Sequence, residues 1–143
     1  LGVDLNRLHL IIAVLEKHGG AKLYSQDIFI NIVGGLKIDE PSVDLAIAAA
    51  LVSSLRQQEL DPQTVYLGEV GLTGEVRAVS FIEQRIKESI KLGFTRFVLP
   101  ASNRKAILDL DPGQIKPDVF KKIRFLKNIG ELLGDRQSRS LDL

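Results

Sequence analysis

The sequence of 143 residues contains no cysteine, no methionine and no tryptophan, and its only histidines are His9 and His18. Without cysteine the chain forms no disulfide and no thiolate metal site, and two isolated histidines are too few for a zinc site. A single histidine on a helix is more often structural or exposed than catalytic. We therefore expect neither a metal nor a cofactor in this chain.

Long apolar runs are missing as well. No stretch approaches the roughly 20 apolar residues of a membrane-spanning helix, and none has the basic, apolar and small-residue segments of a signal peptide. We therefore expect no contact with a membrane and a cytoplasmic location. Because the chain has no methionine and begins directly in a helical pattern, we interpret it as a piece of a longer protein, with part of the function in the missing sequence.

Nucleotide-binding motifs are also missing. The chain has no G-x-x-x-x-G-K-[ST], and a hairpin turn explains the glycines of "GEVGLTGEV". We therefore expect no ATP hydrolysis by this chain. Aromatic residues make up 6% of the sequence, and no row of them is spaced for base stacking. With 19 basic and 18 acidic residues the net charge is +1, so nucleic-acid binding would require basic residues to gather on one face.

The apolar patterns that are present predict a mixed α/β domain. Residues at helical spacing predict helices in "LGVDLNRLHLIIAVLEKHGG", after Pro41 and from Ile82 to about Gly93; the middle one is apolar almost all round, so we expect it to be central. Runs rich in β-branched residues predict strands in "DIFINIVGG", "TVYLGEV", "EVRAVS" and "TRFVLP", and "IRFLKNIGELLG" predicts a last strand and a short helix. We expect one domain over residues 1–134, with a small mixed sheet packed against helices, and a disordered tail over 135–143.

Ser42 stands at the start of the middle helix and has two interpretations. Nucleophilic catalysis needs a hydroxyl, a base and donors for the oxyanion, and Ser42 with the helix start supplies the first and the last. The candidate base, Lys37, follows a predicted strand, where lysines are usually solvated and charged. First-turn serines are also common for helix capping alone. The residues favour the cap and leave the nucleophile as the alternative.

Several stretches together carry a resemblance to a known family. They are "GVDLNRLHLIIAVLEKHGG", "DIFINIVGGLKIDEPSVDLAIAAALVSS", "GEVGLTGEVRAVSFIEQRIKESIKLGF" and "RFVLP". In order and spacing they resemble the carboxy-terminal domain of the RadA (Sms) family of bacterial DNA recombination and repair proteins. That domain is related to the protease domain of Lon. The resemblance covers nearly everything before the tail and implies a Lon-protease-like fold that assembles into hexameric rings.

The same resemblance places the Lon catalytic residues on this chain. "DEPSVDLA" aligns with "DGPSAGI" of Lon, which puts Ser42 on the nucleophile, and "SFIEQR" aligns with "GGLKEK", which puts Glu83 on the catalytic lysine. Glu83 lies four residues before Lys87, the spacing of an ordinary helix-surface pair. The "GGLK" that ends at Lys37 precedes the serine and is therefore in the wrong place. We predict that the dyad is broken and that this chain is not an enzyme.

Members of the RadA family join a cysteine zinc finger, a RecA-like ATPase and this domain. The resemblance thus implies a parent protein that is a DNA-dependent ATPase, with ATP, magnesium and zinc bound in the parts absent here. It also implies three partners, namely DNA, further copies of the chain in a hexamer, and the RecA-like ATPase domain. With no aromatic platform in the sequence, we expect contact with the backbone of duplex DNA rather than with its bases.

The candidate DNA contacts are the basic residues Arg7, Lys17, Lys22, Lys37 and Arg77. A ring of identical domains multiplies a small basic patch, so a few phosphate contacts per subunit give substantial, salt-dependent affinity. Each of these residues is also explained as a solvated surface charge, and Arg7 and Arg77 as contacts between subunits. The stretch "KPDVFKKIRFLK" is basic, but we interpret its apolar residues Val119, Phe120, Ile123 and Phe125 as core. Its lysines then form a solvated face.

Three hypotheses remain from the sequence. The first is a non-catalytic, ring-forming, DNA-binding domain of a RadA-type protein. The second is an active serine peptidase or hydrolase that uses Ser42 with Glu83 or Lys37. The third is a purely structural assembly module whose parent protein contacts DNA elsewhere.

Overall fold

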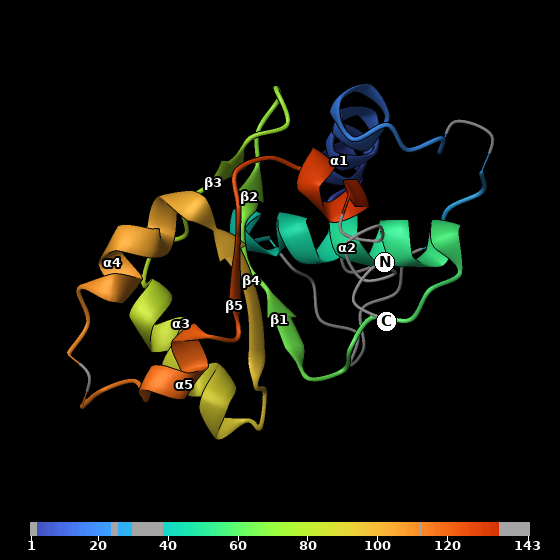
Figure 1. Ribbon diagram of the computed structural model, residues 1–143. Helices are drawn as coiled ribbons and strands as arrows, with labels where there is room; N and C mark the ends of the chain where they lie inside the picture. Colours follow the sequence, from blue (N-terminus) through green and yellow to red (C-terminus); the bar gives the residue numbers. More distant parts are fainter. Residues whose placement is uncertain (1–2, 24–25, 30–38, 112, 135–143) are drawn as a thin grey trace.

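The computed structural model describes residues 3–23, 26–29, 39–111 and 113–134, and all structural statements below refer to these residues. Their elements follow one another in a mixed α/β order (Figure 1). In chain order they are α1 (Leu5–His18), the 3-10 turn η1 (Pro41–Val43), α2 (Asp44–Arg56), β1 (Thr64–Tyr66), β2 (Glu69–Val70), β3 (Val76–Arg77), α3 (Ile82–Lys91), β4 (Arg96–Pro100), η2 (Ala101–Asn103), α4 (Arg104–Leu108), α5 (Pro117–Phe120) and β5 (Ile123–Leu126). A further helical turn covers 130–134.

The main sheet is parallel and three-stranded, in the order β1-β4-β5. Thr64 is paired with Arg96, and Phe97 with Ile123, so the amino ends of the three strands lie side by side. Strands β2 and β3 form a separate antiparallel hairpin in which Glu69 is paired with Arg77. The chain beyond β5 then runs along β3, because Val76 donates its N–H to the carbonyl of Lys127 at 2.9 Å. The predicted mixed α/β class is confirmed.

Two hydrophobic cores lie on opposite faces of the three-stranded sheet. Figure 1 shows α1 and α2 on one side and α3, α4 and α5 on the other. Side chains of β4 alternate between them, since Val98 packs into the core with α1 and α2 while Phe97 and Leu99 pack into the core with α3 and α4. We call these the first core and the second core.

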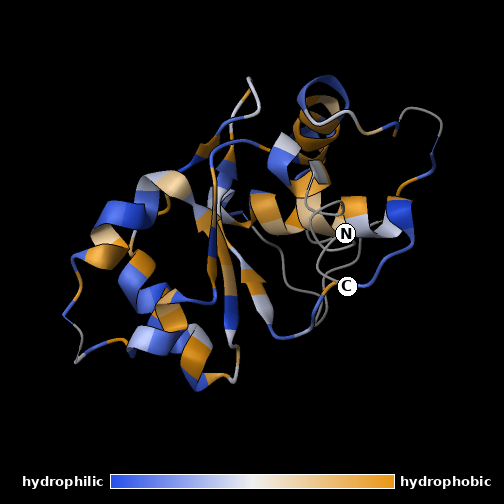
Figure 2. Cartoon of the chain, in the orientation of Figure 1, coloured by the Kyte–Doolittle hydropathy of each residue, from blue (hydrophilic) through white to orange (hydrophobic). Residues whose placement is uncertain are grey.

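The three predicted helices are confirmed. Helix α1 begins after Asp4, whose carboxylate accepts the N–H of Asn6 at 3.0 Å, and it ends at Gly19. Helix α2 is central, as expected, because most of its residues are buried, and Figure 2 shows hydrophobic colour along much of its length. Helix α3 buries Ile82 and Ile86 against the second core.

The predicted strands differ from the structure in length. "TVYLGEV" divides into β1 and β2, because the N–H of Gly68 turns away from β4 and donates to the carbonyl of Ser42 at 2.9 Å. "EVRAVS" forms a strand only at Val76–Arg77. After Arg77, the side-chain amide of Asn103 replaces a neighbouring strand. Its Oδ1 accepts the N–H of Val79 at 2.9 Å, and its Nδ2 donates to the carbonyl of Val79 at 3.0 Å.

Other expectations are met in part or fall outside the described residues. Of "DIFINIVGG", residues 27–29 carry no strand and 30–35 lie outside the described residues, as does the tail over 135–143. "TRFVLP" forms β4 from Arg96 onward, and "IRFLKNIGELLG" forms β5 and the turn at 130–134. Of the apolar residues of "KPDVFKKIRFLK", Val119, Phe120, Ile123 and Phe125 are half-buried and pack against the second core, whereas Leu126 is buried in the first core. The short helices α4 and α5 were not predicted, because five and four residues are too few to show helical spacing.

Candidate functional site

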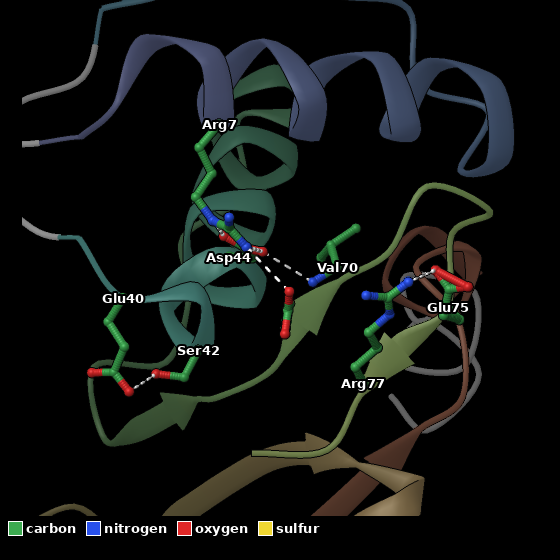
Figure 3. A network of polar contacts seen from close by, with 8 residues as sticks. Arg7, Glu40, Ser42, Asp44, Val70, Glu75 and Arg77 are labelled. Carbon is green, nitrogen blue, oxygen red and sulfur yellow. Dashed lines mark hydrogen bonds and ion pairs between the residues drawn. The ribbon is translucent and has the colours of Figure 1, made fainter. Parts of the chain in front are cut away.

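Ser42 lies in η1 and is buried, with 6% of its surface exposed. Its hydroxyl donates to Oε1 of Glu40 at 2.7 Å, as Figure 3 shows, and accepts from Nη1 of Arg85 at 3.2 Å. Arg85 forms an ion pair with Glu40 as well, and its Nε donates to the carbonyl of Ser80 at 2.8 Å. Ser42 is therefore held between a carboxylate from its own loop and a guanidinium from α3.

The carboxylate beside Ser42 is held in its ionised form. The hydrogen bond from Arg85 lowers the pKa of Glu40 below its usual range, and the hydrogen bond from Ser42 lowers it further. A carboxylate with a depressed pKa is a weak base toward a serine hydroxyl. The prediction that Ser42 caps a helix is wrong. Its hydroxyl bonds the side chain of Glu40 instead of a backbone N–H, and neither η1 nor α2 has a side-chain cap.

Glu83 lies in the first turn of α3 and bonds Lys87. Its Oε1 accepts from Nζ of Lys87 at 2.8 Å, which confirms the surface pair expected from the spacing. Lys37, the other base considered from the sequence, lies outside the described residues. Within the described part of the chain, Ser42 thus has Glu40 and Arg85 as its side-chain partners.

A second polar cluster joins α1, α2 and β2 (Figure 3). Asp44 begins α2, is fully buried, and accepts from Nε and Nη2 of Arg7, each at 2.5 Å. The N–H of Val70 donates to the same carboxylate at 3.1 Å, and Glu69 lies 3.7 Å from Nη2 of Arg7. The hydrogen bonds to Asp44 raise the pKa of Arg7. The bidentate pair therefore fixes α1 to the start of α2 and to the hairpin.

Arg7 thus has a structural task that its sequence context did not reveal. Its side chain is 27% exposed and its guanidinium is engaged with Asp44. Sequence reasoning missed the role of Asp44. In the sequence, Asp44 is an acidic residue in the first turn of a helix, and the helix dipole is enough to explain an acid there. The role of Arg7 in DNA binding stays a prediction.

Arg77 lies on the other edge of the same hairpin. Its Nη2 is 3.8 Å from Oε1 of Glu75, and its side chain is half exposed. The hydroxyl of Thr73 donates to Glu75 at 2.5 Å, and this bond lowers the pKa of Glu75, as the charge of Arg77 does to a smaller extent. The carboxylate of Glu75 lies over Gly71, and a Cβ at Gly71 would displace it. The fold brings Arg7 and Arg77 to one hairpin, with Glu69 near both.

Lys17 and Lys22 lie at and beyond the end of α1, and both are exposed. Neither forms an ion pair with an acidic residue in the described ranges. His9 and His18 are exposed on α1. The described residues contain no group of acidic residues and histidines placed to hold a metal ion. Among the same residues, no helix is both long and apolar enough to cross a membrane.

The fold and these clusters define a mixed α/β domain with a buried serine tied into ion pairs. A family model described as subunit ChlI of Mg-chelatase matches residues 7–103, more than half of the chain, so the chain belongs to this family. The chain is also related to RadA-type DNA repair proteins. It is 52% identical over 102 residues to DNA repair protein RadA of Halalkalibacterium halodurans, a match that covers 71% of this chain and 22% of the relative.

Two further relatives have the same name. DNA repair protein RadA of Bacillus subtilis is 53% identical over 102 residues, covering 71% of this chain and 22% of the relative. That of Streptococcus pyogenes serotype M3 is 49% identical over 112 residues, covering 78% and 24%. The chain therefore spans about a quarter of the length of the curated relatives it matches.

Proposed function

We propose that this chain is the Lon protease-like carboxy-terminal domain of a RadA-type DNA repair and recombination protein, and that it serves as a hexameric scaffold and DNA-binding surface without catalysis. The observation that carries the proposal is the identity of about half of the residues with RadA proteins over 71–78% of the chain. In the parent protein, a RecA-like ATPase with ATP, magnesium and zinc would supply the chemistry, in the cytoplasm.

The absence of catalysis is supported by what replaces the glycines of Lon. In the alignment of "DEPSVDLA" with "DGPSAGI", the two glycines are replaced by Glu40 and Asp44, and these carboxylates hold Arg85 and Arg7. In the alignment of "SFIEQR" with "GGLKEK", the second glycine is replaced by Phe81, which has the left-handed φ of 58° that glycine adopts without strain. At these three positions, larger side chains thus stand where Lon has glycine, and two of them form ion pairs.

The hydrolase hypothesis makes the opposite prediction for Ser42. An active enzyme would be labelled stoichiometrically by a serine-directed electrophile, and Ser42→Ala would abolish the labelling. We expect no labelling, because Ser42 is buried and its partner Glu40 is a weak base. The third hypothesis, a purely structural module, shares the hexamer with our proposal and differs from it only in binding no DNA.

The first experiment is light scattering on the purified chain, with labelled duplex DNA titrated at two salt concentrations. We expect the mass of a hexamer and an affinity that falls steeply with salt, because contacts to phosphates release counterions. A hexamer that binds no DNA at low salt would leave the assembly role alone. A monomer would contradict the scaffold part of the proposal.

A further inference from the structure

A groove of about 340 Å³ crosses the amino ends of the three parallel strands. Thr64 and Arg96 begin β1 and β4, and Lys121 and Lys122 lead from α5 into β5. These residues are far apart in the sequence, and the register of the sheet brings them together, since Thr64 pairs with Arg96 and Phe97 pairs with Ile123. The basic stretch "KPDVFKKIRFLK" was visible in the sequence, but the groove was not predicted, because its walls come from three separate segments.

The groove is strongly basic. It is lined by four cationic residues, Arg96, Lys121, Lys122 and Arg124, and among its described lining residues the acid is Asp61. Lys121 and Lys122 are exposed, and 64% of the Arg96 side chain is exposed. The whole chain has nearly equal numbers of basic and acidic residues and a net charge of +1. The groove has four basic residues to one acidic residue, so positive charge is concentrated there.

The cations differ in how firmly they are held. Arg124 donates from Nη2 to the carbonyl of Glu131 at 2.8 Å, which fixes it in the wall of the groove. Arg96 is paired loosely, with Nε 3.5 Å from Oδ2 of Asp61. A loose, half-exposed pair of this kind adds little to stability, so Arg96 gives up little on turning toward an anion.

The shape and chemistry of the groove suit a phosphodiester backbone. Thr64 also lines the groove, and its hydroxyl is a neutral group of the kind that donates to phosphate oxygens. Phe97 lines the groove but is only 1% exposed, so it offers no surface on which a base could stack. These features favour contact with phosphates over reading of bases.

We propose that this groove is where the domain contacts the DNA backbone, through Arg96, Lys121 and Lys122. The inference rests on the proposed DNA-binding function and names its site. It shifts that site away from Lys17 and Lys22 near α1 and from the hairpin, where Arg7 is engaged with Asp44. It also revises the interpretation of the lysines in "KPDVFKKIRFLK" as a merely solvated face.

The test compares three double variants of the 143-residue chain by anisotropy with a labelled duplex of random sequence. The groove variant is Lys121→Ala with Lys122→Ala. The matched control, Lys91→Ala with Lys105→Ala, removes the same charge from exposed positions on α3 and α4. The third variant, Lys17→Ala with Lys22→Ala, tests the region near α1. Circular dichroism confirms that each variant is folded.

We expect the groove variant to bind roughly tenfold more weakly near 50 mM salt, and its slope of log affinity against log salt to fall by about two, one for each lost phosphate contact. The control should bind like the parent chain. Equal binding by the groove variant and the parent would overturn the groove while leaving DNA binding intact. A parent chain that binds no duplex at low salt would overturn the DNA-binding function and the groove together.

A substitution that strengthens binding gives an independent check. In the parent chain, the carboxylate of Asp61 accepts the N–H of Gln63 at 2.8 Å. Asp61→Asn removes the negative charge from the groove but keeps an oxygen that can accept this bond. We expect DNA affinity to rise about fivefold, the effect of one charge at close range in water. Unchanged affinity in Asp61→Asn would count against the groove.

Discussion

At the scale of single residues, Ser42 shows how a serine in a nucleophile-like setting is used for structure. Its hydroxyl links Glu40 to Arg85, and its carbonyl accepts the N–H of Gly68. The resemblance to Lon placed this serine within a motif, and that placement stays a prediction. It did not reveal the partners, because Arg85 is 43 residues away and reaches Ser42 only when α3 is packed.

The Glu40 carboxylate should make stability depend on pH. Its folded-state pKa is lowered from 4.5, mainly by Arg85, so its contribution is complete above that value and is lost as the pH falls through the folded-state pKa. We expect Glu40→Gln to destabilise the chain near neutral pH, with a difference from the parent that shrinks below about pH 4.5. Urea unfolding at several pH values measures it. A difference that is constant with pH would contradict the assignment.

Phe81 offers a test of backbone strain. It precedes α3 with a φ of 58°, and its side chain is 71% exposed, so the ring contributes little burial. We expect Phe81→Gly to raise the free energy of unfolding by about 0.5–1 kcal/mol, because glycine adopts left-handed φ without strain. Phe81→Ala is the matched control, since it removes the ring and keeps Cβ. Equal stability of the two variants would show that φ is not the cause.

At the scale of secondary structure elements, the cluster around Asp44 determines how α1 is attached. Helical spacing predicted α1, α2 and α3 because each has enough turns to show an apolar face. The pattern did not predict which helices contact each other, or that "EVRAVS" would stop early. Both depend on long-range partners, Arg7 for Asp44 and Asn103 for Val79.

Removing Arg7 should weaken this attachment strongly. Arg7→Ala leaves the Asp44 carboxylate buried without its counter-charge, which we expect to cost about 3–5 kcal/mol of unfolding free energy. Lys17→Ala, on the same helix and exposed, should change it by less than about 0.5 kcal/mol. Urea unfolding gives both values. The double variant Arg7→Met with Asp44→Leu should lose less than Arg7→Ala alone, and an equal loss would argue against a charge effect.

At the scale of the whole molecule, the α/β class and the central position of α2 were predictable, and the basic groove was not. Class follows from local patterns of apolar residues, which a single sequence displays. The groove depends on the parallel register that places the start of β4 beside that of β5, and register is a property of the assembled sheet. Lys121 and Lys122 therefore looked like any solvated pair until their neighbours across the sheet were known.

The alternation of β4 between the two cores has a consequence for hydrogen exchange. Phe97 and Leu99 belong to one core and Val98 to the other, and β4 bonds β1 on one side and β5 on the other. Neither core can open without disturbing this strand. We therefore expect the amide protons of β4 to be exchanged with solvent only when the whole domain opens. The two cores should then behave as one cooperative unit.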